Sequence, residues 1–103
     1  MQFVLQLGFC NFRNYVAIAQ QAEAAGWSAL SMPDSLFFPR ATESAYPYAD
    51  TEAIRGYIEH AEFIEPFVAM ATMAAVTQRI RLYPGVLKVP VRQPLVLAKS
   101  LAS

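Results

Sequence analysis

The sequence is poor in the residues on which disulfide, metal and nucleotide sites depend. Cys10 is the only cysteine and His60 the only histidine, which excludes a disulfide framework and a multi-cysteine metal site within the chain. The four glycines are scattered, so no P-loop or dinucleotide-binding loop is present, and no HxH or HExxH pair indicates a metal hydrolase. No apolar run reaches membrane-spanning length and no signal peptide opens the chain, so we expect a cytoplasmic protein with no membrane partner and no metal.

Acidic residues are missing from the last part of the chain. All eight acids fall within residues 1–65, whereas residues 66–103 carry five bases: Arg79, Arg81, Lys88, Arg92 and Lys99. This distribution has two interpretations, a basic flank for a phosphorylated ligand or a solvated surface whose acidic partners lie elsewhere. The overall balance of eight acids and eight bases gives no indication of a nucleic-acid partner.

Apolar residues, in contrast, are abundant for so short a chain. They make up 55% of the 103 residues. A chain of this length buries only about 65% of the surface that its unfolded form exposes. We therefore expect other protein surface to cover part of these side chains, in a longer chain or in an intimate oligomer.

The hydrophobic pattern predicts a strand, a helix and a second strand at the start of the chain. Residues 2–8 alternate as a strand, and residues 27–32 form the next one. Between them, Asn14 is expected to cap a helix that ends at Gly26. The apolar face of this helix comprises Tyr15, Ile18, Ala19 and Ala22. A βαβ unit of this spacing is predicted to be parallel and right-handed.

A long connection and a second helix follow. Residues 36–64 show little periodicity, so we expect a lid or binding loop with a short helix at residues 53–63. Its tyrosines are expected to pack within the lid or to stack on a cofactor; they are Tyr46, Tyr48 and Tyr57. Glu65 and Pro66 are typical of a helix start. The buried face of that helix is predicted to comprise Phe67, Met70, Ala71 and Ala74.

A third strand begins at Ile80, is interrupted by a bulge at Pro84 and Gly85, and is predicted to resume over residues 86–89, before Pro94 opens a last helix. Three parallel strands leave two edges and an inner face uncovered. The predicted fold is therefore α/β, the N-terminal third of an eight-stranded (β/α)8 TIM barrel. Residues 1–103 are expected to be a single partial domain, truncated after the third strand and the start of its following helix.

In such a barrel the functional groups lie at the C-terminal ends of the strands. Asp34 follows the second strand and is expected either to contact a cofactor or substrate or to cap a turn. Ser35 beside it is a candidate hydrogen-bond donor or a local cap. Phe9 and Cys10 after the first strand are candidates for lining a substrate pocket, with Cys10 as a packed thiol rather than a nucleophile. His60 is more typical of a solvated loop residue than of a catalytic one.

Four segments resemble one known family in their order and spacing. They are AEAAGW (residues 22–27), MPDS (32–35), FVAMATMAAVTQRIRL (67–82) and GVLKVPVRQPLVLAK (85–99). Over essentially its whole length the chain resembles the N-terminal part of the luciferase-like monooxygenase family, which contains bacterial luciferase and the deazaflavin-dependent oxidoreductases.

This resemblance implies a barrel that binds a reduced flavin-type cofactor, either FMN or a deazaflavin coenzyme of the F-420 type. Family members often carry a non-prolyl cis peptide at the end of the third strand, which matches Gly85 and Val86 and implies that these residues support the cofactor ring. The family's acidic residue after the second strand falls on Asp34, which implies a role in catalysis and cofactor binding. Many members have histidine where this chain has Ser35 and Gln93. In several relatives the first of these histidines acts in proton transfer or near the reactive ring. Ser35 is a poor general base in its place, because a free hydroxyl does not titrate near neutral pH.

The resemblance thus implies an enzyme, a flavin- or deazaflavin-dependent oxidoreductase or monooxygenase that transfers hydride or activates oxygen and takes a small-molecule substrate. Residues 1–103 alone are expected to be inactive. The alternative is a non-catalytic barrel fragment that acts as a binding or assembly module. A reading frame that continues past Ser103 into further β/α units favours the enzyme, for which a homodimer is a possible full-length assembly.

Overall fold

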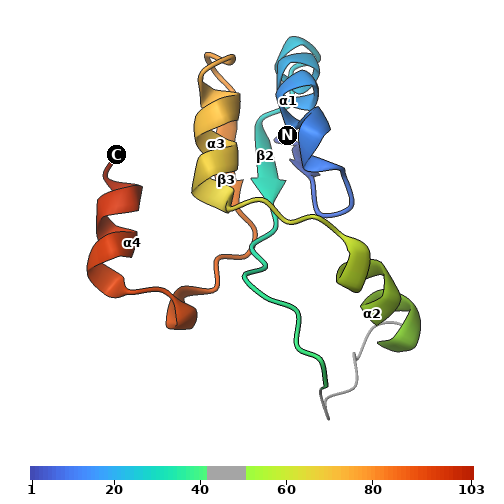
Figure 1. Ribbon diagram of the computed structural model, residues 1–103. Coiled ribbons are helices and arrows are strands. Elements are labelled where there is room, and N and C mark those ends of the chain that lie inside the picture. Colours follow the sequence, from blue (N-terminus) through green and yellow to red (C-terminus); the bar gives the residue numbers. More distant parts are fainter. Residues whose placement is uncertain (42–50) are drawn as a thin grey trace.

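The computed structural model of the protein describes residues 1–41 and 51–103, apart from the side chain of Thr51. Tyr46 and Tyr48 of the expected lid lie outside the described residues. In chain order the elements are β1 (Val4–Gln6), the 3₁₀ turn η1 (Phe12–Asn14), α1 (Tyr15–Ala24), β2 (Ala29–Met32), α2 (Thr51–His60), α3 (Pro66–Ala74), β3 (Arg81–Pro84), the 3₁₀ turn η2 (Val89–Val91) and α4 (Pro94–Leu101), as Figure 1 shows. Within the described ranges, no helix is both long enough and apolar enough to cross a membrane.

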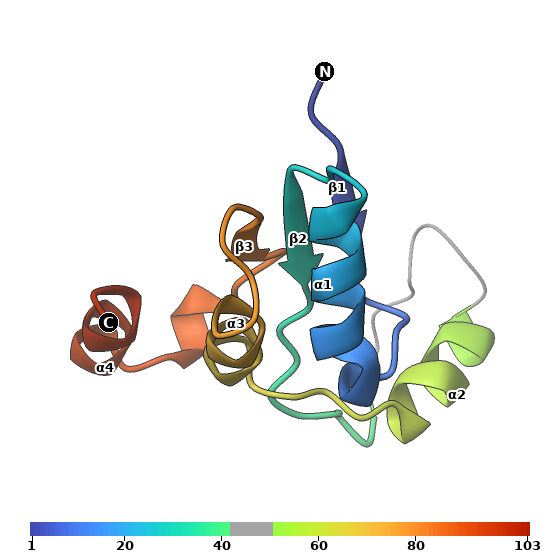
Figure 2. The same cartoon turned by 90° about the horizontal axis from the view of Figure 1, so that it is seen from above.

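The three strands form one parallel sheet in the order β1-β2-β3, which confirms the predicted α/β fold with parallel strands. Side chains alternate between the two faces of a strand, so the register aligns two rows. One row is Leu5, Leu30 and Leu82, and the other is Gln6, Ser31 and Tyr83. Helices α1 and α3 lie side by side on the leucine face of the sheet, as the view in Figure 2 shows.

The core lies between this leucine face and the two helices, and small residues bring the layers close together. Ala19 of α1 and Ala69 of α3 are buried there, beside the fully buried Leu30 and Met73. Complete burial of a large apolar side chain stabilises the folded state by about 1.5–3 kcal/mol. The buried face of α1 is the predicted one, Tyr15, Ala19 and Ala22, with Ile18 partly buried.

The ends of α1 agree only in part with the sequence pattern. Gly26 has a positive φ of 82° and closes the helix, as expected. The predicted cap at Asn14 is wrong, because Asn14 is already helical and its side chain makes no capping hydrogen bond. The chain instead enters α1 through η1, and Asn11 caps that turn by accepting a hydrogen bond from the backbone N–H of Arg13 at 2.9 Å.

Helix α3 begins as predicted but buries a different face. The Glu65 carboxylate accepts hydrogen bonds from the backbone N–H groups of Phe67 and Val68, at 2.7 and 3.1 Å. The fully buried residues are Pro66, Ala69 and Met73. Of the predicted stripe, Met70 is partly buried against the core, and all four residues, Phe67, Met70, Ala71 and Ala74, line a groove towards α4. The sequence of α3 is apolar on nearly every side, so its periodicity does not determine the rotation of the helix.

The predicted resumption of the third strand after Gly85 is also wrong. β3 ends at Pro84, a turn follows, and the chain forms η2 instead of more strand. The backbone N–H of Lys88 donates to the Asp34 side chain rather than to a neighbouring strand. Pro90 has no N–H to offer to a strand ladder. Beyond Gly85, whose N–H still donates to the Met32 carbonyl, the loop after β3 is therefore attached to the segment after β2 through the Asp34 side chain.

Glu23, near the end of α1, accepts hydrogen bonds from three consecutive backbone N–H groups. These belong to Gln78, Arg79 and Ile80, with shortest N–O distances of 2.8, 2.8 and 3.3 Å. The hydrogen bonds from Arg79 and Gln78 hold the pKa of the Glu23 carboxyl below its ordinary value. Glu23 thus ties the end of α1 to the turn that leads into β3.

We predict that Glu23→Gln lowers the thermal unfolding midpoint at neutral pH. Because the folded-state pKa of Glu23 is depressed, its contribution is present above the ordinary glutamate pKa of about 4.3 and is lost as the pH falls through the lower folded value. The difference between variant and wild type should therefore shrink on acidification. Glu59→Gln, on the exposed surface of α2, is the control. Equal midpoints for Glu23→Gln and wild type at neutral pH would contradict this role.

Candidate functional site

The C-terminal ends of the three parallel strands meet at one edge of the sheet. β1 leads into Gly8 and Phe9, β2 into Pro33 and Asp34, and β3 into Gly85. Because the strands are parallel and adjacent, loops distant in sequence converge at this edge, below the β2 arrowhead in Figure 1. The candidate site is built from these loops.

Gly85 sits directly on side chains of the other two strands. Its N–H donates to the Met32 carbonyl at 2.8 Å, and its carbonyl accepts from Nε2 of Gln6 at 3.0 Å. A Cβ atom at this position would overlap the Ser31 hydroxyl, so the close approach requires glycine. The peptide bond between Gly85 and Val86 is cis, as the resemblance implied. Val86 is 75% exposed and presents an apolar surface beside the strand ends.

Asp34 lies buried next to the turn at Gly85 and Val86, with only 1% of its side chain exposed. Its Oδ1 accepts a hydrogen bond from Nη2 of Arg92 at 2.8 Å, and Oδ2 accepts from the Lys88 backbone N–H at 2.8 Å and from Nε of Arg92 at 3.3 Å. Burial raises the pKa of the Asp34 carboxyl, but the hydrogen bonds from Arg92 and Lys88 outweigh that effect and hold the pKa below its ordinary value. Asp34 is therefore ionised at neutral pH.

Arg92 extends this contact to α3. Its Nη1 lies 2.9 Å from Oε1 of Glu65, and its guanidinium carbon lies 5.4 Å from the centre of the Phe67 ring. The hydrogen bond to Asp34, and the weaker one to Glu65, raise the pKa of Arg92. Arg92 belongs to residues 66–103, which contain no acidic residue. Its acidic partners, Asp34 and Glu65, come from earlier in the sequence.

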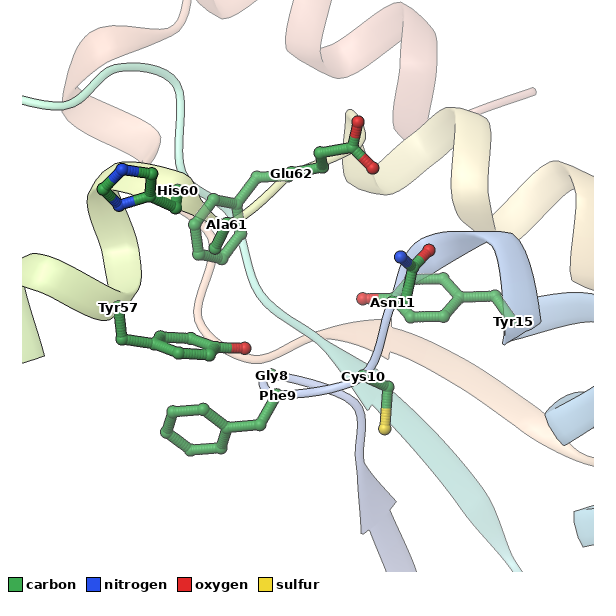
Figure 3. Close-up of a pocket in the computed structure, with 10 residues that line it drawn as sticks. Gly8, Phe9, Cys10, Asn11, Tyr15, Tyr57, His60, Ala61 and Glu62 are labelled. Carbon is green, nitrogen blue, oxygen red and sulfur yellow. The ribbon is translucent and has the colours of Figure 1, made fainter.

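A separate cavity of about 390 Å³ opens between the loop after β1 and the end of α2. Its lining comprises Gly8, Phe9, Cys10, Asn11, Tyr15, Tyr57, His60, Ala61, Glu62 and Phe63. In Figure 3 the rings of Phe9 and Tyr57 lie on the same side of the cavity, and their centres are 5.2 Å apart. Burial, followed by the proximity of Cys10 and Tyr57, raises the pKa of the Tyr15 phenol, which donates a hydrogen bond to the Leu7 carbonyl.

The structure thus places the expected site residues in two groups. Asp34, the partly buried Ser35, Gly85 and Val86 belong to neighbouring strand ends. Phe9 and Cys10 instead line the cavity beside α2, and His60 is an exposed residue in the last turn of that helix rather than in a loop. Their roles in catalysis, cofactor binding and substrate binding stay predictions.

Sequence reasoning missed Gln6, Ser31 and Arg92 at this site. Gln6 was visible as a polar residue on a strand otherwise rich in apolar residues, but nothing in the sequence named Gly85 as its partner. Arg92 was visible only as one of five bases. Gln93, at a position where histidine was expected from the resemblance, caps α4 by accepting from the Val96 N–H at 2.7 Å.

We predict that Gly85→Ala destabilises the chain by about 1–3 kcal/mol, because the added methyl group overlaps the Ser31 hydroxyl. Ser31→Ala removes that hydroxyl and leaves only the Cβ atom of residue 31, 3.4 Å from the ideal position of the new methyl group. The double variant should therefore recover much of the loss in denaturant unfolding. Independent, additive effects of the two substitutions would show that the contact is not the cause.

We also predict that Arg92→Ala destabilises the chain by about 3 kcal/mol at neutral pH, because it leaves a buried carboxylate unpaired. The depressed pKa of Asp34 makes this contribution present above the ordinary aspartate value of about 3.9, and lost as the pH falls through the lower folded pKa. Chemical denaturation at several pH values measures it. Arg13→Ala, which removes an exposed pair with Glu62, is the control and should cost under about 1 kcal/mol. Equal losses for the two variants would contradict the prediction.

Comparisons with known proteins agree with this arrangement. Residues 3–103 match the family described as luciferase-like monooxygenase. The chain is 39% identical over 103 residues to an uncharacterized protein of Mycobacterium bovis and to uncharacterized proteins of two Mycobacterium tuberculosis strains; these matches cover 100% of this chain and 35% of each relative. The chain therefore spans about a third of the length of the curated relatives it matches. No solved structure matches it significantly. The chain belongs to the luciferase-like monooxygenase family.

Proposed function

We propose that this protein is a flavin- or deazaflavin-dependent oxidoreductase, and that the chain supplies the first three strands of an eight-stranded β/α barrel. The observation that carries the proposal is the turn at Gly85 and Val86 after β3, where Gly85 lies against Gln6 and Ser31 and Val86 is exposed. Family membership supports the reaction class. The matching Mycobacterium proteins are uncharacterized, so the substrate and the cofactor are part of the proposal.

Gly85 and Val86, in the turn after β3, fit a planar ring cofactor. Gly85 has no side chain above its backbone, and Val86 offers an exposed apolar surface against which a ring face can pack. Gln6 holds the Gly85 carbonyl and so limits movement of this surface. Gly85 and Val86 would support the ring. Asp34 would act from the neighbouring strand end, where its carboxylate binds the loop that carries these two residues.

A bound flavin or deazaflavin supplies hydride transfer or oxygen activation, and the residues of this chain position the reactants. The cavity walled by Phe9 and Cys10 is the proposed substrate pocket, and its aromatic wall of Phe9 and Tyr57 suits an apolar or planar molecule. Ser35 would contribute a hydrogen bond rather than act as a base, because its hydroxyl does not titrate near neutral pH.

Cofactor titration of the intact protein tests the proposal. We expect saturable binding of reduced FMN or of the reduced deazaflavin coenzyme, because Val86 in the turn after β3 offers a surface for the ring. Absorbance measures this binding. The resemblance favours deazaflavin slightly. Residues 1–103 alone should bind much more weakly, since the part of the chain that the structure describes provides three of the eight strands proposed for the barrel. If the intact protein binds neither cofactor, the proposal fails, and the non-catalytic binding or assembly module becomes the better explanation.

A further inference from the structure

The loop after β3 is held at several points between the strand end and α4. At its start, the Gly85 N–H donates to the Met32 carbonyl at 2.8 Å. At its end, Gln93 caps α4. Between these points, the Lys88 N–H and the Arg92 side chain both donate hydrogen bonds to Asp34, which follows β2. Asp34 is thus the attachment of the middle of the loop to β2.

The surroundings of Asp34 do not suit a residue that touches a ligand. Both carboxylate oxygens accept hydrogen bonds from the loop after β3, and 1% of the side chain is exposed. A direct contact with a cofactor would require the loop after β3 to move aside, because only 1% of the Asp34 side chain is exposed. That movement would break hydrogen bonds to a buried charged group, which is costly. The three hydrogen bonds to the Asp34 carboxylate all come from this loop.

Arg92 is well suited to hold the loop in one place. Its guanidinium contacts Asp34 through two nitrogens and Glu65 through a third, and its side chain is only 14% exposed. Glu65 also caps α3, so Arg92 connects the loop to a helix packed on the sheet. A planar guanidinium can make all these bonds at once, whereas the ammonium group of a lysine cannot reproduce the geometry.

We propose that Asp34 and Arg92 are positioning residues, which act together to hold residues 85–88 in the place where a ring cofactor lies, and that Asp34 does not itself contact the cofactor. This inference rests on the proposed function. It differs from the expectation of a direct cofactor contact at Asp34, and the two make different predictions for Arg92.

The test is a double-substitution cycle on cofactor binding in the intact protein. Asp34→Asn, Arg92→Ala and the double variant are titrated with the reduced cofactor that the unchanged protein binds, at a temperature well below unfolding. We expect each single substitution to weaken Kd by about tenfold, the order of effect when a group that orients a binding segment is removed. The double variant should bind no more weakly than the worse single variant, because both substitutions break the same link.

Two further variants separate positioning from general stability. Arg92→Lys keeps the charge but should restore only part of the affinity. Arg79→Ala removes another arginine of the same part of the chain and should leave Kd unchanged, since the Arg79 side chain is exposed. If Arg92→Ala leaves Kd unchanged while Asp34→Asn weakens it, or if the two effects multiply in the double variant, Asp34 contacts the cofactor directly and the inference is overturned.

Amide hydrogen exchange gives a readout that does not depend on the cofactor. Arg92→Ala should speed exchange at residues 85–88, including the Lys88 amide, while the amides of β1 and β2 keep their protection. Unchanged exchange at residues 85–88 would overturn the inference even if a cofactor binds. If the unchanged protein binds no cofactor but exchange responds as expected, the proposed function fails while the attachment of the loop by Asp34 and Arg92 stands.

Discussion

A buried carboxylate must have its charge compensated where it lies, and Asp34 meets this requirement with groups from a single loop. Arg92 and the Lys88 N–H surround it, so the loop after β3 cannot move away without leaving a charge unpaired in the protein interior. This contact attaches the loop at Lys88 and Arg92, whereas Gly85 is held by the Met32 carbonyl and by Gln6. An apolar residue after β2 would leave the loop without such an attachment.

The parallel sheet explains why these groups meet. Helices α1 and α3 cover one face of the sheet and hold the strands in register, so the strand ends lie at a common edge (Figure 2). Gln6 then reaches the Gly85 carbonyl from β1, while Asp34 reaches the middle of the loop from β2. Packing on one face of the sheet thus controls the position of polar groups at its edge.

The two parts of the site differ in how they are built. The turn at Gly85 is held by hydrogen bonds to β1 and β2, and the rest of the loop is held by the buried ion pair of Asp34 and Arg92. Together they form a surface that is attached at several points. The cavity beside Phe9 is shared with α2, whose residues Tyr57 and His60 come from the long connection after β2. The surface built on the strands is where the proposed cofactor would lie, and a wall from a long connection is the kind of segment that commonly differs between homologous proteins.

The sequence by itself determined the order of the elements, the parallel βαβ unit, the helix starts at Pro66 and Pro94 and the end of α1 at Gly26, because these features depend on residues close together in the chain. It also identified Asp34 and Gly85 as strand-end residues. Only the tertiary structure decided which face of the apolar helix α3 is buried, where the chain leaves β3, and that Arg92 pairs with Asp34, 58 positions away. Those outcomes depend on contacts between segments that are distant in the sequence. Local patterns of polar and apolar residues do not indicate which two charged residues will be buried side by side.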